Sequence, residues 1–216
     1  LYMKLEINVP SSLNEITLGQ YQEFLKLADN NPEGTFLQSK MISIFCNIPL
    51  ADAYRLKVNS VSQIVSILTE MLSVTPERVE RFNIGDIEYG IIPDLNDMSL
   101  GEYIDLDASI GDWDNMHKAM NVLYRPIKNS IVGKYNIEEY SVTNTDKMKA
   151  TPLSAALGSL VFFWSLGKEL SMATILSSEE AQKVEGLQEM ITFLQSGVGT
   201  LPSLDYHMET LQELMQ

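Results

Sequence analysis

Cysteine and histidine are scarce in this sequence, and their scarcity excludes several kinds of site. The single cysteine, Cys46, has no partner for an internal disulfide, which favours a reducing compartment and a small buried thiol. The two histidines, His117 and His207, lie far apart, and no Cys/His cluster has zinc-ligand spacing. Nucleophile-elbow, P-loop and dinucleotide-binding motifs are absent too. We therefore predict that the protein is not an enzyme and has no catalytic residues, no cofactor and no metal site.

Basic residues are also in short supply. The 216-residue chain has 15 lysines and arginines against 29 acids, which gives a formal net charge of −14. Binding to nucleic acid or to an anionic membrane surface needs a basic footprint, so neither is an expected partner. The negative charge instead favours solubility or a partner with a basic protein surface.

Long apolar runs are lacking as well. The stretch Leu153–Gly167 carries no charge, but it is shorter than a membrane span and is followed by Lys168 and Glu169. We expect it to form a central helix that is buried on all sides and that follows an N-cap at Thr151. The first residues contain no signal-peptide core, so secretion through a signal peptide is not expected.

The hydrophobic spacing and the turn residues of the sequence predict a mainly α fold with a minor β element, an α+β helical domain. The β element consists of an N-terminal strand at Met3–Val9 and a hairpin at Val79–Ile92 with Gly85 in its turn. Helical spacing recurs in Leu18–Ala28, Phe36–Cys46, Pro49–Leu56, Val61–Leu72, Ser178–Gln195 and Leu204–Met215.

The remaining segments indicate where the chain divides into two parts. Ile127–Tyr140 is ambiguous between strand and loop, and the polar segment Glu138–Ala150 is the best loop candidate. We expect residues 1–150 to form an α+β core domain with the central hairpin. Residues 151–216 are expected to be a C-terminal helical region packed on that domain.

The segment Asp94–Pro126 holds the densest set of signals. It begins with seven carboxylates and no base as far as Asp114: Asp94, Asp97, Glu102, Asp105, Asp107, Asp112 and Asp114. Ser99 and Glu102 form a capping box, which predicts a helix that begins at Leu100. The apolar residues of this helix, Leu100, Tyr103, Ile104 and also Leu106, are expected on one face.

A second helix is expected to follow at once. Asp112 is a plausible N-cap, and the apolar residues Trp113, Met116, Met120, Leu123 and Tyr124 fall near helical spacing. Arg125-Pro126 ends this helix, because a residue before proline is disfavoured in the helical region. The carboxylates from Asp105 to Asp112 do not match a calcium loop, since the glycine is misplaced and position twelve is Met116.

The helix start at Ser99 has a counterpart near the beginning of the chain. Ile16-Thr-Leu-Gly-Gln-Tyr21 parallels Met98-Ser-Leu-Gly-Glu-Tyr103, and Thr17 with Gln20 is again a capping box. Two copies do not make a repeat protein, so we interpret them as one helix-start solution used twice.

These segments together resemble those of a known group of proteins. The short N-terminal strand, the helix TLGQYQEF, the hairpin and the segment SLGEYIDLD…WDNMHKAMNVLYRP are similar to small virion-assembly proteins of tailed bacteriophages, in particular the tail-assembly or baseplate-hub chaperone-like group. The resemblance implies a non-enzymatic protein that binds other phage structural proteins. It also implies a place in the host cytoplasm during assembly, or in the virion, with oligomers possible inside the assembly. The alternative is a cytosolic acidic protein-binding module or regulator unrelated to phage.

The expected contact surface is the acidic segment and the helix after it. Aromatic side chains commonly anchor interfaces, and uncompensated negative charge suits a basic partner. The residues expected to make the contact are Tyr103, Asp105, Asp107, Asp112, Trp113, Asp114 and Tyr124. The competing interpretation is that Trp113 and Tyr103 pack the two helices into the core. Likewise, Met116, Met120 and Met148 are either an adaptable binding surface or core filling.

Overall fold

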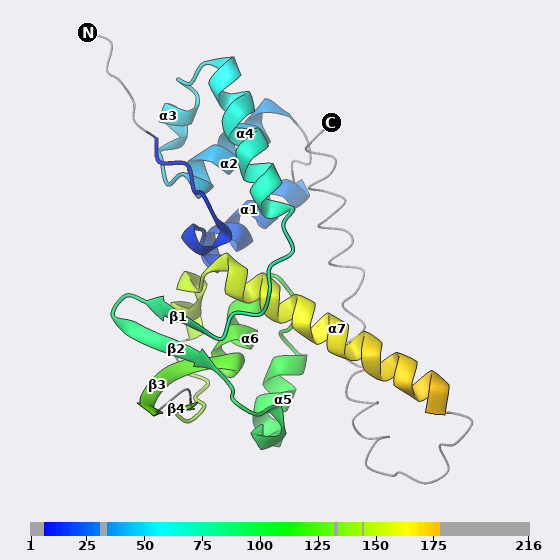
Figure 1. Ribbon diagram of the computed structural model, residues 1–216. Helices are drawn as coiled ribbons and strands as arrows, with labels where there is room; N and C mark the ends of the chain where they lie inside the picture. Colours follow the sequence, from blue (N-terminus) through cyan, green and yellow to red (C-terminus); the bar gives the residue numbers. More distant parts are fainter. Residues whose placement is uncertain (1–6, 31–33, 132–133, 144, 178–216) are drawn as a thin grey trace.

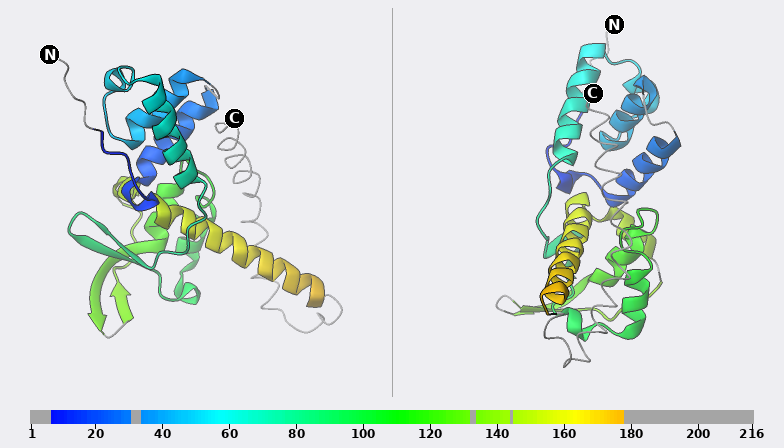
Figure 2. Two further views of the ribbon diagram at one scale, coloured as in Figure 1. Left: turned by 45° about the horizontal axis from the view of Figure 1, so that its top comes forward. Right: turned by 90° about the vertical axis from the view of Figure 1, so that its right-hand side faces the viewer.

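A computed structural model describes residues 7–30, 34–131, 134–143 and 145–177. The fold is α+β and mainly helical, as predicted. Helices α1–α4 gather at one end of the molecule, and a small sheet with helices α5 and α6 forms the other end (Figure 1). Helix α7 begins between these two parts and then projects away from them, which a view from the side also shows (Figure 2).

The elements have the following bounds in chain order. The helices are α1 (Leu18–Asn30), α2 (Thr35–Phe45), α3 (Leu50–Ala53), α4 (Val58–Leu72), α5 (Leu100–Asp107), α6 (Met116–Leu123) and α7 (Leu153–Ser177). Three 3₁₀ helices are η1 (Leu13–Glu15), η2 (Leu95–Asp97) and η3 (Thr145–Ala150). The strands are β1 (Arg81–Ile84), β2 (Ile87–Ile91), β3 (Tyr124–Ile131) and β4 (Lys134–Ile137).

The sheet is antiparallel throughout, in the order β1-β2-β3-β4. The predicted hairpin is confirmed, with Ile84 opposite Ile87 and a turn in which Gly85 has a φ of 59°. Strands β3 and β4 extend the sheet in the segment that the sequence left ambiguous. Helix α6 runs directly into β3, because the proline at 126 ends the helix and its extended neighbour Arg125 pairs with Gly90.

The expected N-terminal strand is not part of this sheet. Only Ile7–Val9 of the predicted segment are described, and they form no strand. Ile7 and Val9 instead pack, partly buried, against the core. The helices predicted at 178–195 and 204–215 lie outside the described residues.

Helix α7 departs from its prediction in two ways. Its backbone continues past Lys168 and Glu169 to Ser177. Of the side chains at 153–165, which the structure describes, the buried ones lie within Leu153–Leu160. Within residues 161–165 the side chains are half-buried except for Trp164, which is exposed, because the helix leaves the core at this point (Figure 1). Among the residues that the structure describes, no helix combines the length and the apolarity needed to cross a membrane.

Candidate protein-interaction site

Helix α5 starts as the sequence predicts. The Ser99 amide donates to Glu102 Oε2 at 2.7 Å, and the Glu102 amide donates to Ser99 Oγ at 3.3 Å, so the capping box is complete. The box satisfies two amides that a helix start leaves without a backbone acceptor. The start of the helix is therefore determined locally, by residues within one turn.

The Glu102 side chain does not belong to the acidic surface. It is buried and forms an ion pair with Arg125, whose Nη1 lies 2.8 Å from Glu102 Oε1. Burial alone would raise the pKa of this carboxyl group, but the hydrogen bonds from Ser99 and the charge of Arg125 together lower the pKa below its usual value. Glu102 is thus ionised in the folded protein and attaches α5 to strand β3.

This ion pair helps determine which side of α5 is buried. The buried side of the helix carries Glu102 and Leu106, whereas Leu100 is 73% exposed and Ile104 is 55% exposed. The expected single apolar face is wrong for Leu106, which lies on the buried side with Glu102, whereas Leu100 and Ile104 lie on the outer side. All exposed residues on the outer side of the helix and at its C-terminal cap are apolar: Leu100, Gly101, Ile104 and Ala108. We call these four residues the α5 apolar face.

Carboxylates border this face. Asp97 in η2 is exposed, and Asp105 and Asp107 are half-buried on α5. Asp105 accepts a hydrogen bond from the Tyr140 hydroxyl at 2.7 Å, and the pKa of Tyr140 is raised by burial and by this carboxylate. Tyr103 is half-buried on the same helix. The structure therefore brings Tyr103, Asp105 and Asp107, three of the predicted contact residues, to the edges of the α5 apolar face.

Asp112 and Asp114 form a separate turn before α6. Asp112 Oδ1 accepts from the Asp114 amide at 3.0 Å, and its Oδ2 accepts from Asn115 Nδ2 at 2.6 Å. Asp114 pairs with Lys26 at 3.1 Å on the surface. The predicted N-cap at Asp112 is wrong, because this turn delays the helix and α6 starts at Met116.

Trp113 and Tyr124 lie in the core. The competing interpretation therefore holds for Trp113, whereas Tyr103, which it also named, is half-buried. Trp113 contacts Tyr21 edge to face, with ring centroids 4.9 Å apart. The Tyr124 hydroxyl donates to the Val79 carbonyl oxygen and accepts from Ser159 Oγ. Met116, Met120 and Met148 are fully buried, so they fill the core and are not a surface. These side chains hold α6 and β3 in place and are not available to a partner.

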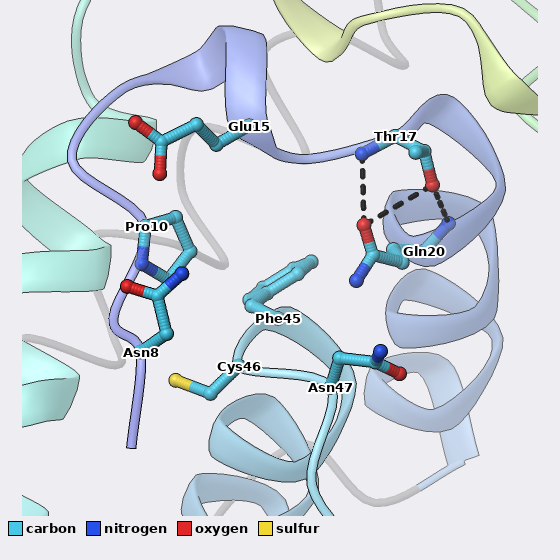
Figure 3. Close-up of a pocket in the computed structure, with 8 residues that line it drawn as sticks. All are labelled: Asn8, Pro10, Glu15, Thr17, Gln20, Phe45, Cys46 and Asn47. Atoms are coloured by element: carbon cyan, nitrogen blue, oxygen red, sulfur yellow. Dashed lines mark hydrogen bonds between the residues drawn. The ribbon is translucent and has the colours of Figure 1, made fainter. Parts of the chain in front are cut away.

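The structure also contains a pocket that the sequence did not indicate. About 570 Å³ in volume, it is lined by Asn8, Pro10, Glu15, Thr17, Gln20, Phe45, Cys46 and Asn47 (Figure 3). Burial raises the pKa of the Cys46 thiol to about 11, so it is protonated and a poor nucleophile at neutral pH. The Gln20 side chain is already bonded to Thr17 and to the Ile44 carbonyl oxygen. The lining thus shows no activated nucleophile.

The described residues contain no cluster of three or more histidine, cysteine or acidic side chains able to hold a metal ion. Comparison of the chain with protein-family models, with curated proteins and with solved structures found no match. The case for a site therefore rests on the geometry of α5. Sequence spacing could not identify Gly101 and Ala108 as part of it, because helical periodicity does not show which face is covered.

Proposed function

We propose that this is a non-enzymatic bacteriophage tail or virion assembly or structural protein that acts through protein–protein contacts made at the α5 apolar face. The observation that carries the proposal is the exposure of Leu100 and Ile104 on a helix bordered by Asp97, Asp105 and Asp107. Burying each of these two side chains against a partner is worth about 1.5–3 kcal/mol. The resemblance of SLGEYIDLD and TLGQYQEF to virion-assembly proteins gives the biological setting.

The charge of the chain supports a basic partner. The net charge is −14, and no lysine or arginine occurs between Arg81 and Lys118, the stretch that contains α5. Such a surface attracts a basic protein surface and repels a second acidic one. The partners are accordingly other phage structural proteins with basic patches, met in the host cytoplasm during assembly or kept together in the virion.

The second candidate is a cytosolic acidic protein-binding module or regulator unrelated to phage. The same observation favours it, because an acidic border around apolar side chains suits any basic partner. The two candidates differ in where the protein is found. Mass spectrometry of purified phage particles and of assembly intermediates distinguishes them, since only the assembly protein accompanies phage structural proteins.

A paired-variant experiment tests the role of the surface. Leu100→Ser with Ile104→Ser removes the apolar contact, and we expect it to reduce recovery of particles or intermediates while leaving the thermal midpoint nearly unchanged. The matched control is Val58→Ser with Ile67→Ser on α4, which removes two other exposed apolar side chains. If both double variants assemble like the parent protein, the α5 apolar face is not the contact surface.

A further inference from the structure

The two similar helix starts each contain a glycine, and the surroundings of these two glycines differ. The difference indicates the kind of segment that binds α5. A methyl group placed on Gly19 of α1 would lie 3.1 Å from both the Cβ and the carbonyl oxygen of Lys149. The glycine therefore lets η3 approach the first turn of α1 closely. Just beyond η3, the Thr151 carbonyl oxygen accepts from the Leu18 amide at 2.8 Å.

The equivalent glycine of α5 has an open surface. Among the described residues, no atom outside its own turn lies within 4 Å of a methyl group placed on Gly101. Glycine in a helix costs about 0.5–1 kcal/mol relative to alanine, and nothing in the described fold requires that cost at this position. Leu100, which corresponds to the fully buried Leu18, is likewise uncovered. A segment that covers α5 as η3 covers α1 would account for both features.

The segment that covers α1 has a recognisable chemistry. Met148 is fully buried and is flanked by two lysines. Lys147 is half-buried, with its Nζ 5.8 Å from the centre of the Tyr89 ring, and Lys149 is exposed. Lys149 Nζ lies 2.6 Å from Asp146. A segment of the same type would place its apolar side chain beside Leu100 and Ile104 and its basic side chains beside Asp97, Asp105 and Asp107.

We propose that the α5 apolar face binds a basic turn segment of another protein, in which a large apolar side chain lies between lysines or arginines and the backbone crosses α5 at Gly101. This inference rests on the proposed function and specifies the partner of that site. The charge of the border repels an acidic segment, and the open glycine leaves room for backbone at the crossing point. The segment thus has a basic-apolar-basic pattern.

The test uses the full chain and a synthetic peptide of the sequence Thr-Asp-Lys-Met-Lys-Ala-Thr-Pro-Leu, which copies residues 145–153. In NMR titrations we expect saturable shifts at the amides of Gly101 and Ile104, which weaken about tenfold or more at high salt because exposed charges are screened. A control peptide with both lysines replaced by glutamate should cause no such shifts. Shifts that are absent, or equal for both peptides, overturn the proposal.

Glycine variants separate docking from stability. Gly101→Ala should raise the thermal midpoint, because alanine is the better helix former, and should weaken peptide binding about tenfold. Gly19→Ala should lower the midpoint and leave binding at α5 unchanged. Unchanged peptide affinity in Gly101→Ala overturns the inference. If Leu100→Ser with Ile104→Ser abolishes particle assembly while Gly101→Ala assembles normally, the proposed function stands and the backbone crossing does not.

Other occupants give different results. If the full chain dimerises and Ile104→Asp dissociates the dimer, the occupant is a second copy of the chain. If an Ile104→Cys variant is protected from maleimide in the free monomer, the occupant is another part of the same chain. Either result overturns the proposal, whereas rapid labelling of the monomer that the peptide slows supports it. Cys46 is the internal reference, because it is buried and its thiol is protonated.

Discussion

Helices α1 and α5 begin with nearly the same sequence and have opposite surroundings. Both start with a hydroxyl residue, Leu, Gly, a Gln or Glu, and Tyr, and both capping boxes are formed. Leu18 is fully buried, while its counterpart Leu100 is 73% exposed. A capping box thus determines where a helix begins, and the segments packed around it determine which face is buried.

The Gln or Glu that closes each box, three positions after the hydroxyl residue, shows how the surroundings select the residue type. Gln20 donates from Nε2 to the Ile44 carbonyl oxygen at 2.7 Å, a contact that needs an amide. Glu102 faces the Arg125 guanidinium, a contact that needs a carboxylate. The two residues cap their helices in the same way, but they connect them to the fold by different chemistry.

The largest difference in stability between variants of the two helix starts is expected at the Gln or Glu that closes each box. Glu102→Ala leaves Arg125 nearly buried without its counter-charge, and removing one member of a buried pair costs about 3–5 kcal/mol. Gln20→Ala loses neutral hydrogen bonds and should cost about 1–3 kcal/mol. Urea unfolding of both variants measures the difference. Equal losses would show that the charge on Glu102 has no special role.

The leucine pair should give the next largest contrast. Leu18→Ala removes a fully buried side chain and should cost about 2–5 kcal/mol. Leu100→Ala changes an exposed side chain and should stay within about 0.5 kcal/mol of the parent protein. Thermal unfolding of the isolated protein checks both values. A large loss in Leu100→Ala would mean that α5 is covered in the free chain.

Deletion of the capping hydroxyl should destabilise the two helix starts by similar amounts. Thr17→Ala and Ser99→Ala each delete one side-chain cap, and each should cost about 0.5–2 kcal/mol. Because the box is local, the two losses should agree even though the helices differ in burial. Chemical denaturation measures them, and losses that differ by more than about 2 kcal/mol would contradict a purely local role.

The dependence of stability on pH should distinguish the start of α5 from that of α1. The folded-state pKa of Glu102 is lowered, so its carboxylate stabilises the fold above the ordinary glutamate pKa of about 4.3. That contribution is lost as the pH falls through the lowered pKa. Glu102→Gln should therefore lose stability at neutral pH and show a shallower decline in acid than the parent protein. Parallel stability–pH curves for the two proteins would refute this assignment.

The sequence predicted the parts of the fold that depend on neighbouring residues. Both helix starts and the turn at Gly85 follow from spacing within a few residues. The orientation of α5 could not be predicted, because it depends on Arg125, which is remote in the sequence. Strands β3 and β4 were left ambiguous between strand and loop. The start of β3 was predicted as helix, since Tyr124 keeps helical spacing with Met120 and its pairing with Ile91 is long-range.

The candidate site was predicted only in part. Asp105 and Asp107 lie where the acidic pattern places them, at the edges of the α5 apolar face. The sequence left Trp113 open between a contact surface and the core, and the structure places it in the core against Tyr21. A large aromatic side chain gains as much from burial in its own fold as in an interface, so its type alone does not distinguish the two.

The close packing of Gly158 in α7 against the linker at Glu77 has a consequence for the order in which the chain is made and folds. Any side-chain carbon on this residue would collide with the Glu77 carbonyl oxygen, so α7 packs directly beneath the linker between α4 and β1 (Figure 1). A ribosome adds about 5–20 residues per second, and the linker and hairpin therefore emerge seconds before the helix that supports them. During that interval the apolar side chains that α7 later covers are open to chaperones and to other nascent chains. The packing of α7 against this linker can therefore form only after residues 153–160 have been made.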